Sequence, residues 1–331
     1  SFEPLLNQSN QTSTWMESCQ VNIDALGKLT ARIHTTSSGQ GHETLVSTVL
    51  GEVMQIDPEL IRITRPNSLE SLPGNSPVGS RMAIMLGGAA ARAGEKLKAK
   101  IMAIAAHRLG VAIDQLCYEG GDVLAHDGRR FTWDEMVELA HRQYHNLPDG
   151  MDPGLASFDI MQVPTGDALP VDDKVQMYPC YSFEFHLLLV SFDPIIGRPD
   201  IHSYFIGHDC GTVINPAIVS GMTYGGIAHG IGAALFEEFA YDTNGQLLTQ
   251  SFLDYLMPSS HEVPAIQIVK HCTPSPHTVF GQKGSGESGY LGAPAAVSGA
   301  INDAVSGLGI HFEKLPIRMS AISDAIAAKT S

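Results

Sequence analysis

Alternating polar and apolar residues near the start of the chain predict a β-hairpin over residues 19–35, because a period of two is typical of strands with one buried face. Further along, apolar residues recur with helical spacing, and Thr132 with Glu135 has the pattern of a capping box. These patterns predict three helices in the first half of the chain, at 44–55, 83–107 and 132–144. Three short strands are expected between them, at 61–64, 116–118 and 121–125.

A proline-rich stretch separates this half from the next. Residues 146–173 carry four prolines, so we expect a linker there, or a long ordered loop that lies over a partner subunit. Beyond it, strands are predicted at 181–192, 203–208 and 266–271. Helices are expected at 221–239 and in a segment that ends near Val305.

The irregular order of helices and strands favours an α+β fold, with mixed sheets and flanking helices, over a doubly wound sheet. We predict two α+β subdomains, 1–150 and 151–331. The first would contain glycine loops around Gln40 and Ser80, and the second would contain loops around Asp209 and Glu287.

Composition narrows the class of protein. The 331 residues are 44% hydrophobic and 17% charged, which is the balance of a folded chain. A net charge of −15 makes nucleic acid and anionic membrane surfaces poor partners. The five cysteines are widely spaced and lack C-x-x-C, which argues against a zinc ribbon or a thiolate-held iron–sulfur cluster and suits a reducing compartment. Without a signal peptide or a bilayer-spanning apolar run, we expect a cytoplasmic protein.

Glycine is concentrated where loops meet predicted elements. Four such junctions stand out, at 38–43, 78–81, 209–212 and 284–289. Glycine permits a close approach by a ligand, and the backbone amides at a helix start favour an anion. Tight turns and close helix packing explain any single cluster equally well. Four together suggest a large, phosphate-bearing cofactor gripped from several sides.

The last junction matches the dinucleotide pattern G-x-G-x-x-G, yet two observations argue against a nucleotide fold. Only 42 residues follow Gly289 (331 minus 289), too few for the remaining βαβ units. Glu287 would also bring a carboxylate towards a pyrophosphate. We interpret the segment as a loop that presents one carboxylate, with Lys283 as a countercharge. An ordinary glycine turn, or an NAD-dependent oxidoreductase, remains the alternative.

Histidines give no support for a zinc site. His42 and Glu43 do not belong to H-E-x-x-H, because residue 46 is Val. His229 lies in a helix of small residues, where a lone histidine is usually a core residue. The other histidines show no ligand spacing.

Seven segments together resemble a known family. They are SGQGHET (38–44), GSR (79–81), DCGTVINPAIVSG (209–221), GGIAHGIGAALFEE (225–238), FLDYLMPSSHEVP (252–264), TPSPHT (273–278) and KGSGESGYLGAPAAVSGAINDA (283–304). In order and spacing they are similar to the second, C-terminal molybdopterin-binding domain of the xanthine oxidase family of molybdenum hydroxylases. The chain further resembles the medium molybdopterin subunit of nicotinate dehydrogenase-type enzymes, in which two chains share one cofactor. A fragment of a longer subunit is the alternative.

The resemblance implies roles for individual residues. Glu287 matches the catalytic base, and the pterin dithiolene, not a protein side chain, is expected to hold the metal. Cofactor contacts are implied for Gly39, Gln40, Gly41, His42, Gly79, Ser80, Arg81, Asp209, Cys210, His229, Lys283, Gly284, Ser285 and Gly286. Two departures concern the cofactor's surroundings: residues 219–222 read V-S-G-M instead of V-E-G-Q, and His229 replaces a usual Gln. A third is the turn SFDPIIGRPD, which replaces an acidic hairpin.

The resemblance also implies a cofactor, partners and a reaction. The cofactor would be molybdopterin cytosine dinucleotide with molybdenum that carries a sulfido or selenido ligand. Water would supply the oxygen inserted at an electron-poor carbon of a small molecule, with an N-heteroaromatic such as nicotinate expected first and an aldehyde, a purine or CO next. The expected partners are a chain with the first molybdopterin domain, a [2Fe-2S] subunit and an FAD subunit. A non-catalytic subunit that keeps the fold is a further alternative.

Overall fold

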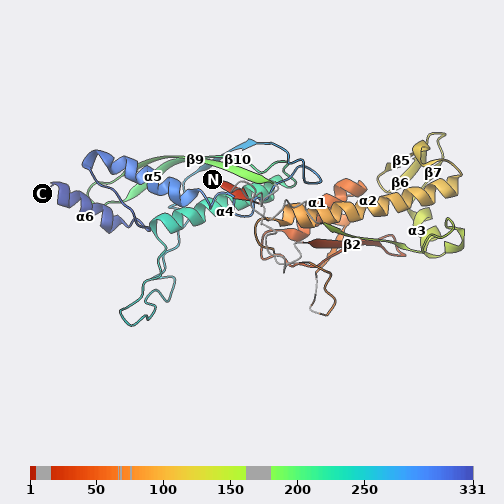
Figure 1. Cartoon of the computed structure of the whole chain (residues 1–331), viewed down its shortest axis with the longest axis horizontal. Helices are drawn as coiled ribbons and strands as arrows, with labels where there is room; N and C mark the ends of the chain where they lie inside the picture. Colours follow the sequence, from red (N-terminus) through yellow and green to blue (C-terminus); the bar gives the residue numbers. More distant parts are fainter. Residues whose placement is uncertain (5–15, 66, 68, 75–76, 162–179, 331) are drawn as a thin grey trace, which may run out of the picture.

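The computed structural model describes residues 1–4, 16–65, 67, 69–74, 77–161 and 180–330. These residues form three sheets and six α-helices, so the predicted α+β class is confirmed. The molecule is elongated, and the two halves of the chain follow one another along its long axis (Figure 1). Each half has its own hydrophobic core.

The first half is built on a four-stranded sheet. Its strands, in spatial order, are β4 (Arg62–Thr64), β3 (Leu29–Ile33), β2 (Glu17–Ile23) and β8 (Leu155–Met161). Strands β2 and β3 pair antiparallel, which confirms the predicted hairpin. Two helices pack on this sheet and on each other, α1 (His42–Met54) and α2 (Met82–Leu109). Small residues let them approach closely, since a Cβ on Gly94 of α2 would lie 2.9 Å from Val53 Cγ1 of α1.

The far end of α2 carries a small satellite. It consists of β5 (Leu116–Glu119), β6 (Asp122–Ala125), β7 (Arg130–Phe131) and α3 (Trp133–His141). The predicted capping box is confirmed, because Thr132 and Glu135 bind each other's backbone amides at the start of α3. The helix ends at His141, before the predicted residue 144, and a 3₁₀ turn follows. The 3₁₀ helices of the described chain are Pro58–Leu60, Ile113–Gln115, Tyr144–Asn146 and Ser306–Leu308.

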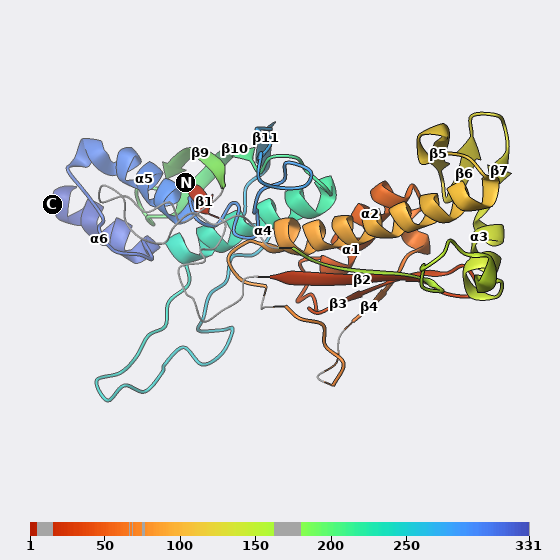
Figure 2. The same ribbon diagram turned by 45° about the vertical axis from the view of Figure 1, so that its right-hand side comes forward.

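The second half contains the other four-stranded sheet. In spatial order its strands are β1 (Phe2–Pro4), β9 (Tyr181–Phe192), β10 (Pro199–Asp209) and β11 (Ile266–His271). The helices of this half are α4 (Pro216–Leu235), α5 (Ala293–Val305) and α6 (Met319–Thr330). Residues of α4 and α5 form the second core with the buried side chains Tyr204 and Ile206 of β10. Between α4 and β11, residues 236–265 form a long irregular arm that extends away from the body (Figure 2).

The short strands β1 and β7 were not expected, and β10 begins at Pro199, ahead of the expected residue 203. Three further elements also differ from the sequence-based expectations. Strand β8 lies inside the stretch 146–173 that we expected to be a linker, and it completes the first sheet by pairing with β2. The division into 1–150 and 151–331 stays a prediction, but β8 favours a boundary beyond Met161. Helix α4 begins at Pro216, ahead of the expected residue 221, because Asn215 Oδ1 accepts hydrogen bonds from the amides of its first turn. Helix α6 was not expected.

Candidate active site

A hollow of about 400 Å³ lies where elements from both halves of the chain meet. Its walls come from the start of α1, the loop before α2, the loop after β10, the start of α4 and the loop before α5. A second, more open hollow of about 560 Å³ adjoins it. The two share Gln40, Ile218, Met222, Gly286 and Glu287. Glu287 is exposed, so its carboxylate stands at the boundary between them.

The structure brings together most of the residues singled out in the sequence. Those that line the first hollow are Gln40, Gly41, His42, Gly79, Ser80, Arg81, Cys210, Lys283, Ser285, Gly286 and Glu287. Gly39 and His229 line the second hollow. Asp209 and Gly284 lie behind the lining of both. Their individual roles stay predictions, but four loops far apart in sequence do converge on one place.

Two helices begin at the first hollow without a side-chain cap. Helix α1 follows Gly41, whose φ of 74° is left-handed, and α2 follows Arg81. Because neither Gly41 nor Arg81 caps its helix with a side chain, the amides of these first turns can donate hydrogen bonds to an anionic ligand. The Nδ1 atom of His42 is also buried and makes no hydrogen bond within the described residues. Burial lowers the pKa of His42, against the opposing pull of Glu43 and Glu17.

The two buried cations of the site are already paired within the protein. Arg81 forms an ion pair with Glu17, and both side chains are buried. Lys283 Nζ lies 2.7 Å from Thr273 Oγ1 and 3.4 Å from Asp209 Oδ1. Each cation therefore fixes the position of its loop more than it offers a free charge to a ligand.

Asp209 joins two loops behind the hollow. Its Oδ1 accepts hydrogen bonds from the amides of Gly211, at 2.8 Å, and Thr273, at 3.1 Å. Burial works to raise the pKa of Asp209, but the hydrogen bonds from Thr273 and Gly211, with the charge of Lys283, outweigh it and hold the pKa below its ordinary value. Asp209 therefore remains a carboxylate that ties residue 273 to the end of β10.

Gln40 has a defined orientation in the glycine loop before α1. Its Oε1 accepts a hydrogen bond from the amide of Ser38 at 2.6 Å. Ser37 Oγ in turn accepts from the amide of Gly41 at 2.9 Å. The loop thus satisfies the carbonyl end of Gln40, a residue that lines both hollows.

Close packing explains the glycines next to Glu287. A Cβ on Gly284 would come within 2.3 Å of the carbonyl oxygen of Ser80, and one on Gly286 would lie 2.8 Å from Ser80 Oγ. A Cβ on Gly226 of α4 would lie 2.3 Å from the carbonyl oxygen of Ser288. The loop of Glu287 is therefore held between the Ser80 loop and α4, and these glycines serve protein packing.

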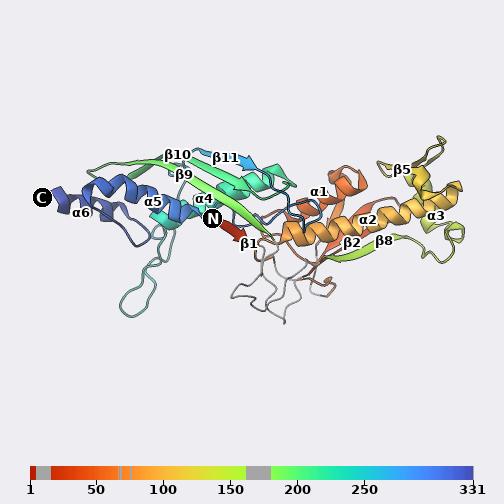
Figure 3. The same cartoon turned by 45° about the horizontal axis from the view of Figure 1, so that its top comes forward.

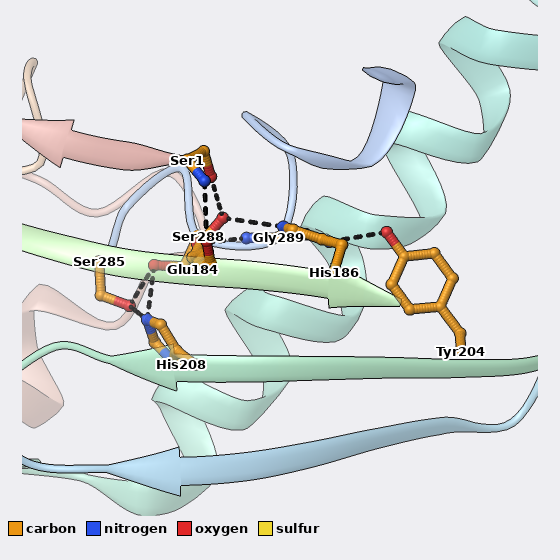
Figure 4. Close-up of polar contacts among 8 residues, drawn as sticks. All are labelled: Ser1, Glu184, His186, Tyr204, His208, Ser285, Ser288 and Gly289. Atoms are coloured by element: carbon orange, nitrogen blue, oxygen red, sulfur yellow. Dashed lines mark hydrogen bonds and ion pairs between the residues drawn. The ribbon is translucent and has the colours of Figure 1, made fainter. Parts of the chain in front are cut away.

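Two residues that the sequence did not point out hold the same loop from the sheet (Figure 4). Glu184 of β9 accepts a hydrogen bond from the amide of Gly289 at 2.7 Å. His208 of β10 lies with Nε2 2.9 Å from Ser288 Oγ. Both side chains are buried, and they grip the two residues that directly follow Glu287. In the sequence, His208 is one of the histidines that show no ligand spacing.

Both groups have shifted pKa values. Burial works to raise the pKa of Glu184, but hydrogen bonds from His186, Gly289 and Ser1 outweigh it and hold the pKa below its ordinary value. Burial lowers the pKa of His208, although Glu184 and Asp209 pull in the opposite direction. Glu184 is therefore a carboxylate, and a neutral His208 can accept the hydroxyl proton of Ser288 at Nε2.

His229 is not the core residue that its sequence surroundings suggested. It is exposed on α4, and its ring stacks on Tyr290 with centroids 4.3 Å apart and planes 23° apart. The pair forms an aromatic wall of the second hollow, close to Glu287.

Comparisons with known proteins agree with this geometry. The molybdopterin cofactor-binding domain family matches residues 2–264. The chain is 33% identical, over 94% of its length, to the nicotine 6-hydroxylase large subunit of Paenarthrobacter nicotinovorans, and covers 37% of that protein. It is 30% identical over 91% of its length to the carbon monoxide dehydrogenase large chain of Hydrogenophaga pseudoflava, and covers 36% of it.

Solved structures show the same fold. Quinoline 2-oxidoreductase from Pseudomonas putida 86 superposes with a TM-score of 0.82 at 32% identity, over 95% of this chain and 38% of that one. A copper- and molybdenum-containing CO dehydrogenase gives a TM-score of 0.87 at 27% identity, over 100% of this chain and 40% of that one.

The fold and the converging loops define a cofactor-binding module. The chain belongs to the molybdopterin cofactor-binding domain family, within the xanthine oxidase family of molybdenum hydroxylases. It spans little more than a third of the length of these curated relatives, 37% and 36%. Within the described residues, no helix has the length and apolar character that crossing a bilayer requires.

Proposed function

We propose that this chain is the molybdenum-cofactor part of a multi-subunit hydroxylase that inserts oxygen from water at an electron-poor carbon of an N-heteroaromatic compound. The observation that carries the proposal is the place of Glu287, an exposed carboxylate at the boundary of two hollows in a family member. The remaining subunits and the rest of the site would come from partner chains or from further sequence.

The residues of the first hollow fit an anionic, phosphate-bearing cofactor. The uncapped amides of α1 and α2 would bind its negatively charged oxygens, with Ser80 and the backbone of residues 283–286 beside them. The buried Nδ1 of His42 supplies a further polar atom at this wall. We propose that the cofactor is molybdopterin cytosine dinucleotide with a sulfido or selenido ligand on the metal.

Glu287 is the proposed base. When bound, the molybdenum cofactor would deliver the water-derived oxygen and accept the two electrons of the reaction. The Glu287 carboxylate would accept a proton at the boundary of the two hollows, and such a base contributes roughly 10²–10⁴-fold to the rate. Glu184, His208 and α4 keep the carboxylate in place by fixing the residues that follow it. Gln40, which lines the same two hollows, would donate a hydrogen bond to the cofactor through its Nε2.

An N-heteroaromatic substrate is favoured by two relatives and by the second hollow. Nicotine 6-hydroxylase and quinoline 2-oxidoreductase are each named after a nitrogen heteroaromatic compound, and both proteins are more than 30% identical to this chain. The stacked His229 and Tyr290 offer a flat aromatic wall to such a ring. CO is the second candidate, because two of the relatives are CO dehydrogenases.

The electrons must leave through partners. We propose a chain with the first molybdopterin domain, a [2Fe-2S] subunit and an FAD subunit, assembled in the cytoplasm. The relatives are named as large subunits or chains, which supports assembly with other subunits.

Isotopic labelling tests the reaction. The complex, purified through this chain, is incubated with nicotinate and an artificial electron acceptor in isotopically labelled water. We expect a hydroxylated product that carries the label of the water. Turnover of CO but not of nicotinate or quinoline would contradict the proposed substrate class. A hydroxylated product that lacks the label of the water would contradict the proposed reaction.

A further inference from the structure

The sheet of the second half has one apolar face that the described part of the chain leaves exposed. Helices α4 and α5 pack on the opposite face (Figure 3). On the exposed face, β9 presents Phe185, Leu187 and Leu189, which are 69%, 56% and 61% exposed. Val269 of β11 adds another large side chain that is 61% exposed.

The strand register makes these side chains neighbours. Phe185 pairs with Gly207, which pairs with Val269 on the other side. Leu187 pairs with Phe205 one step along the sheet. Since alternate residues of a strand share a face and paired residues lie side by side, the five form one contiguous surface. We call it the outer face, defined by Phe185, Leu187, Leu189, Phe205 and Val269.

The first sheet of the same chain provides a comparison. Its outward positions on β2 and β3 include Gln20, Asn22, Thr30 and Arg32, which are polar, as expected of a sheet face that meets water. On β8 the same face carries Phe158, which is 40% exposed. The chain therefore builds an ordinary polar face in one half and an apolar one in the other. An apolar patch of this kind marks an interaction site.

The outer face runs up to the candidate active site. Phe183 is the next outward residue of β9, and the ammonium of Lys283 lies 4.8 Å from the centre of its ring. Lys283 also lines the first hollow. A body that covers the outer face would therefore reach the edge of the hollow.

We propose that the outer face docks the portion of the large subunit that, in the relatives, lies outside the region aligned with this chain. The inference rests on the proposed function, because it assumes that the chain works as part of such a subunit. The aligned region is only 37% of the nicotine 6-hydroxylase large subunit and 36% of the CO dehydrogenase large chain, so most of each relative is available to cover this face.

Net charge and strand pairing limit which body can occupy the outer face. Two copies of the chain would each carry a net charge of −15, and their mutual repulsion opposes homodimer formation through this face. Strand β9 is already paired with β1 and β10, so the occupant need not add a strand to it. It would meet the outer face through an apolar surface of its own.

Site-specific photo-crosslinking tests the surface. A tagged copy of the chain, expressed in its native host, carries p-benzoyl-phenylalanine in place of Phe185, and a matched control carries it in place of Phe158. After irradiation of the purified complex, we expect crosslinks from position 185 to a sequence similar to the unaligned portion of the relatives. Far fewer crosslinks are expected from position 158. Molybdenum is measured in the same samples.

The other outcomes overturn either the docking proposal or the proposed function. Crosslinks from position 185 to a second copy of this chain, to an iron–sulfur subunit or to a flavin subunit would show that the proposed occupant is wrong. An assembled complex without crosslinks from position 185 would show that the outer face is not a docking surface. Expected crosslinks in a complex without molybdenum would leave the docking surface intact and contradict the proposed function instead.

Co-purification of the partner with variants of the outer face measures how strongly this face contributes to docking. Leu187→Ser with Leu189→Ser should weaken co-purification of the partner sequence by at least about tenfold, whereas Phe158→Ser should leave it unchanged. Because the two leucines are exposed, the variant chain should keep the circular dichroism spectrum of the wild type. Unchanged co-purification in the double variant would contradict the proposal.

Discussion

Glu287 differs from the other carboxylates near the site in its exposure. Asp209, Glu184 and Glu17 are buried, whereas Glu287 is exposed at the boundary of the two hollows. In the assembled complex, Glu287→Gln should keep the molybdenum content and lower kcat by about two or more orders of magnitude, because the amide cannot accept the proton. Glu313→Gln, at an exposed position outside the lining, serves as the control. Normal turnover by a fully loaded Gln variant would remove Glu287 from the mechanism.

Glu184 acts on the same loop from behind. Glu184→Leu would leave the amide of Gly289 unpaired, so the loop should shift and kcat should fall by at least about tenfold, with KM changed less. Glu184→Gln keeps an acceptor for that amide and should retain more activity than the Leu variant. The control is Asp159→Asn, a buried carboxylate of the first sheet that pairs with Arg92 and Lys96. Equal kcat in the Leu and Gln variants would show that the hydrogen bond does not position the loop.

His208 makes stability depend on pH in a defined direction. Burial lowers its pKa below the ordinary 6.5, so the unfolded chain binds the proton more readily than the folded one. The stabilising contribution is therefore present above that pH and is lost as the pH falls through the lowered pKa. His42 has a pKa shifted in the same direction, so it adds to this effect.

Urea unfolding measures this dependence. The free energy of unfolding should decrease from about pH 7.5 to about pH 5.5, and His208→Gln should show a smaller decrease. Gln retains an acceptor for Ser288, so the variant isolates the loss of the titrating group. An identical decrease in wild type and variant would contradict the assignment.

At this scale the sequence pointed to Glu287, the proposed base, but not to the residues that hold its loop. Glu287 stands in a six-residue glycine pattern that can be recognised locally. Its supports are bonded across long separations, 105 residues for Glu184 with Gly289 and 80 for His208 with Ser288. Glu184 did leave one signal, a carboxylate between Phe183 and Phe185 in a strand, where a buried charge requires a partner.

Among the elements, α4 and the loop of Glu287 depend on one small residue. A Cβ on Gly226 would lie 2.3 Å from the carbonyl oxygen of Ser288 and 2.8 Å from the amide nitrogen of Tyr290. Gly226→Ala should therefore push the helix and the loop apart and lower the melting temperature. The neighbouring Gly225 has no atom within 4 Å of its Cβ position, so Gly225→Ala should leave the melting temperature unchanged or raise it slightly. Equal effects of the two substitutions would show that the contact is not tight.

Local patterns predicted most elements, and long-range pairing explains those that were missed. The hairpin, the long helix α2, the capping box and strand β11 follow from periodicity or from a short motif. Strand β8 was missed because its flanks are rich in proline and its order comes from pairing with β2, far away in the sequence. Helix α6 had a usable signal in Ile322 and Ile326, which have helical spacing and are both buried.

For the molecule as a whole, the candidate site is an open surface where loops from both halves meet, and it is not a closed pocket. Glu287 and Gly286 are exposed, and the outer face ends beside Lys283. Because the chain aligns with only 37% of the nicotine 6-hydroxylase large subunit, we expect the cofactor to be held only after a body that corresponds to the unaligned portion has docked. The isolated 331-residue chain should accordingly purify without molybdenum.

Metal and nucleotide analysis of the complex, isolated through this chain, tests the central claim most directly. The chain's place in the family and its uncapped helix starts predict stoichiometric molybdenum, together with equimolar cytidine monophosphate after acid hydrolysis. Gly41→Val, at a left-handed position where a Cβ would lie 2.8 Å from Ile218 Cδ1, should abolish both. A complete, assembled complex that contains neither molybdenum nor a cytidine nucleotide would contradict the account.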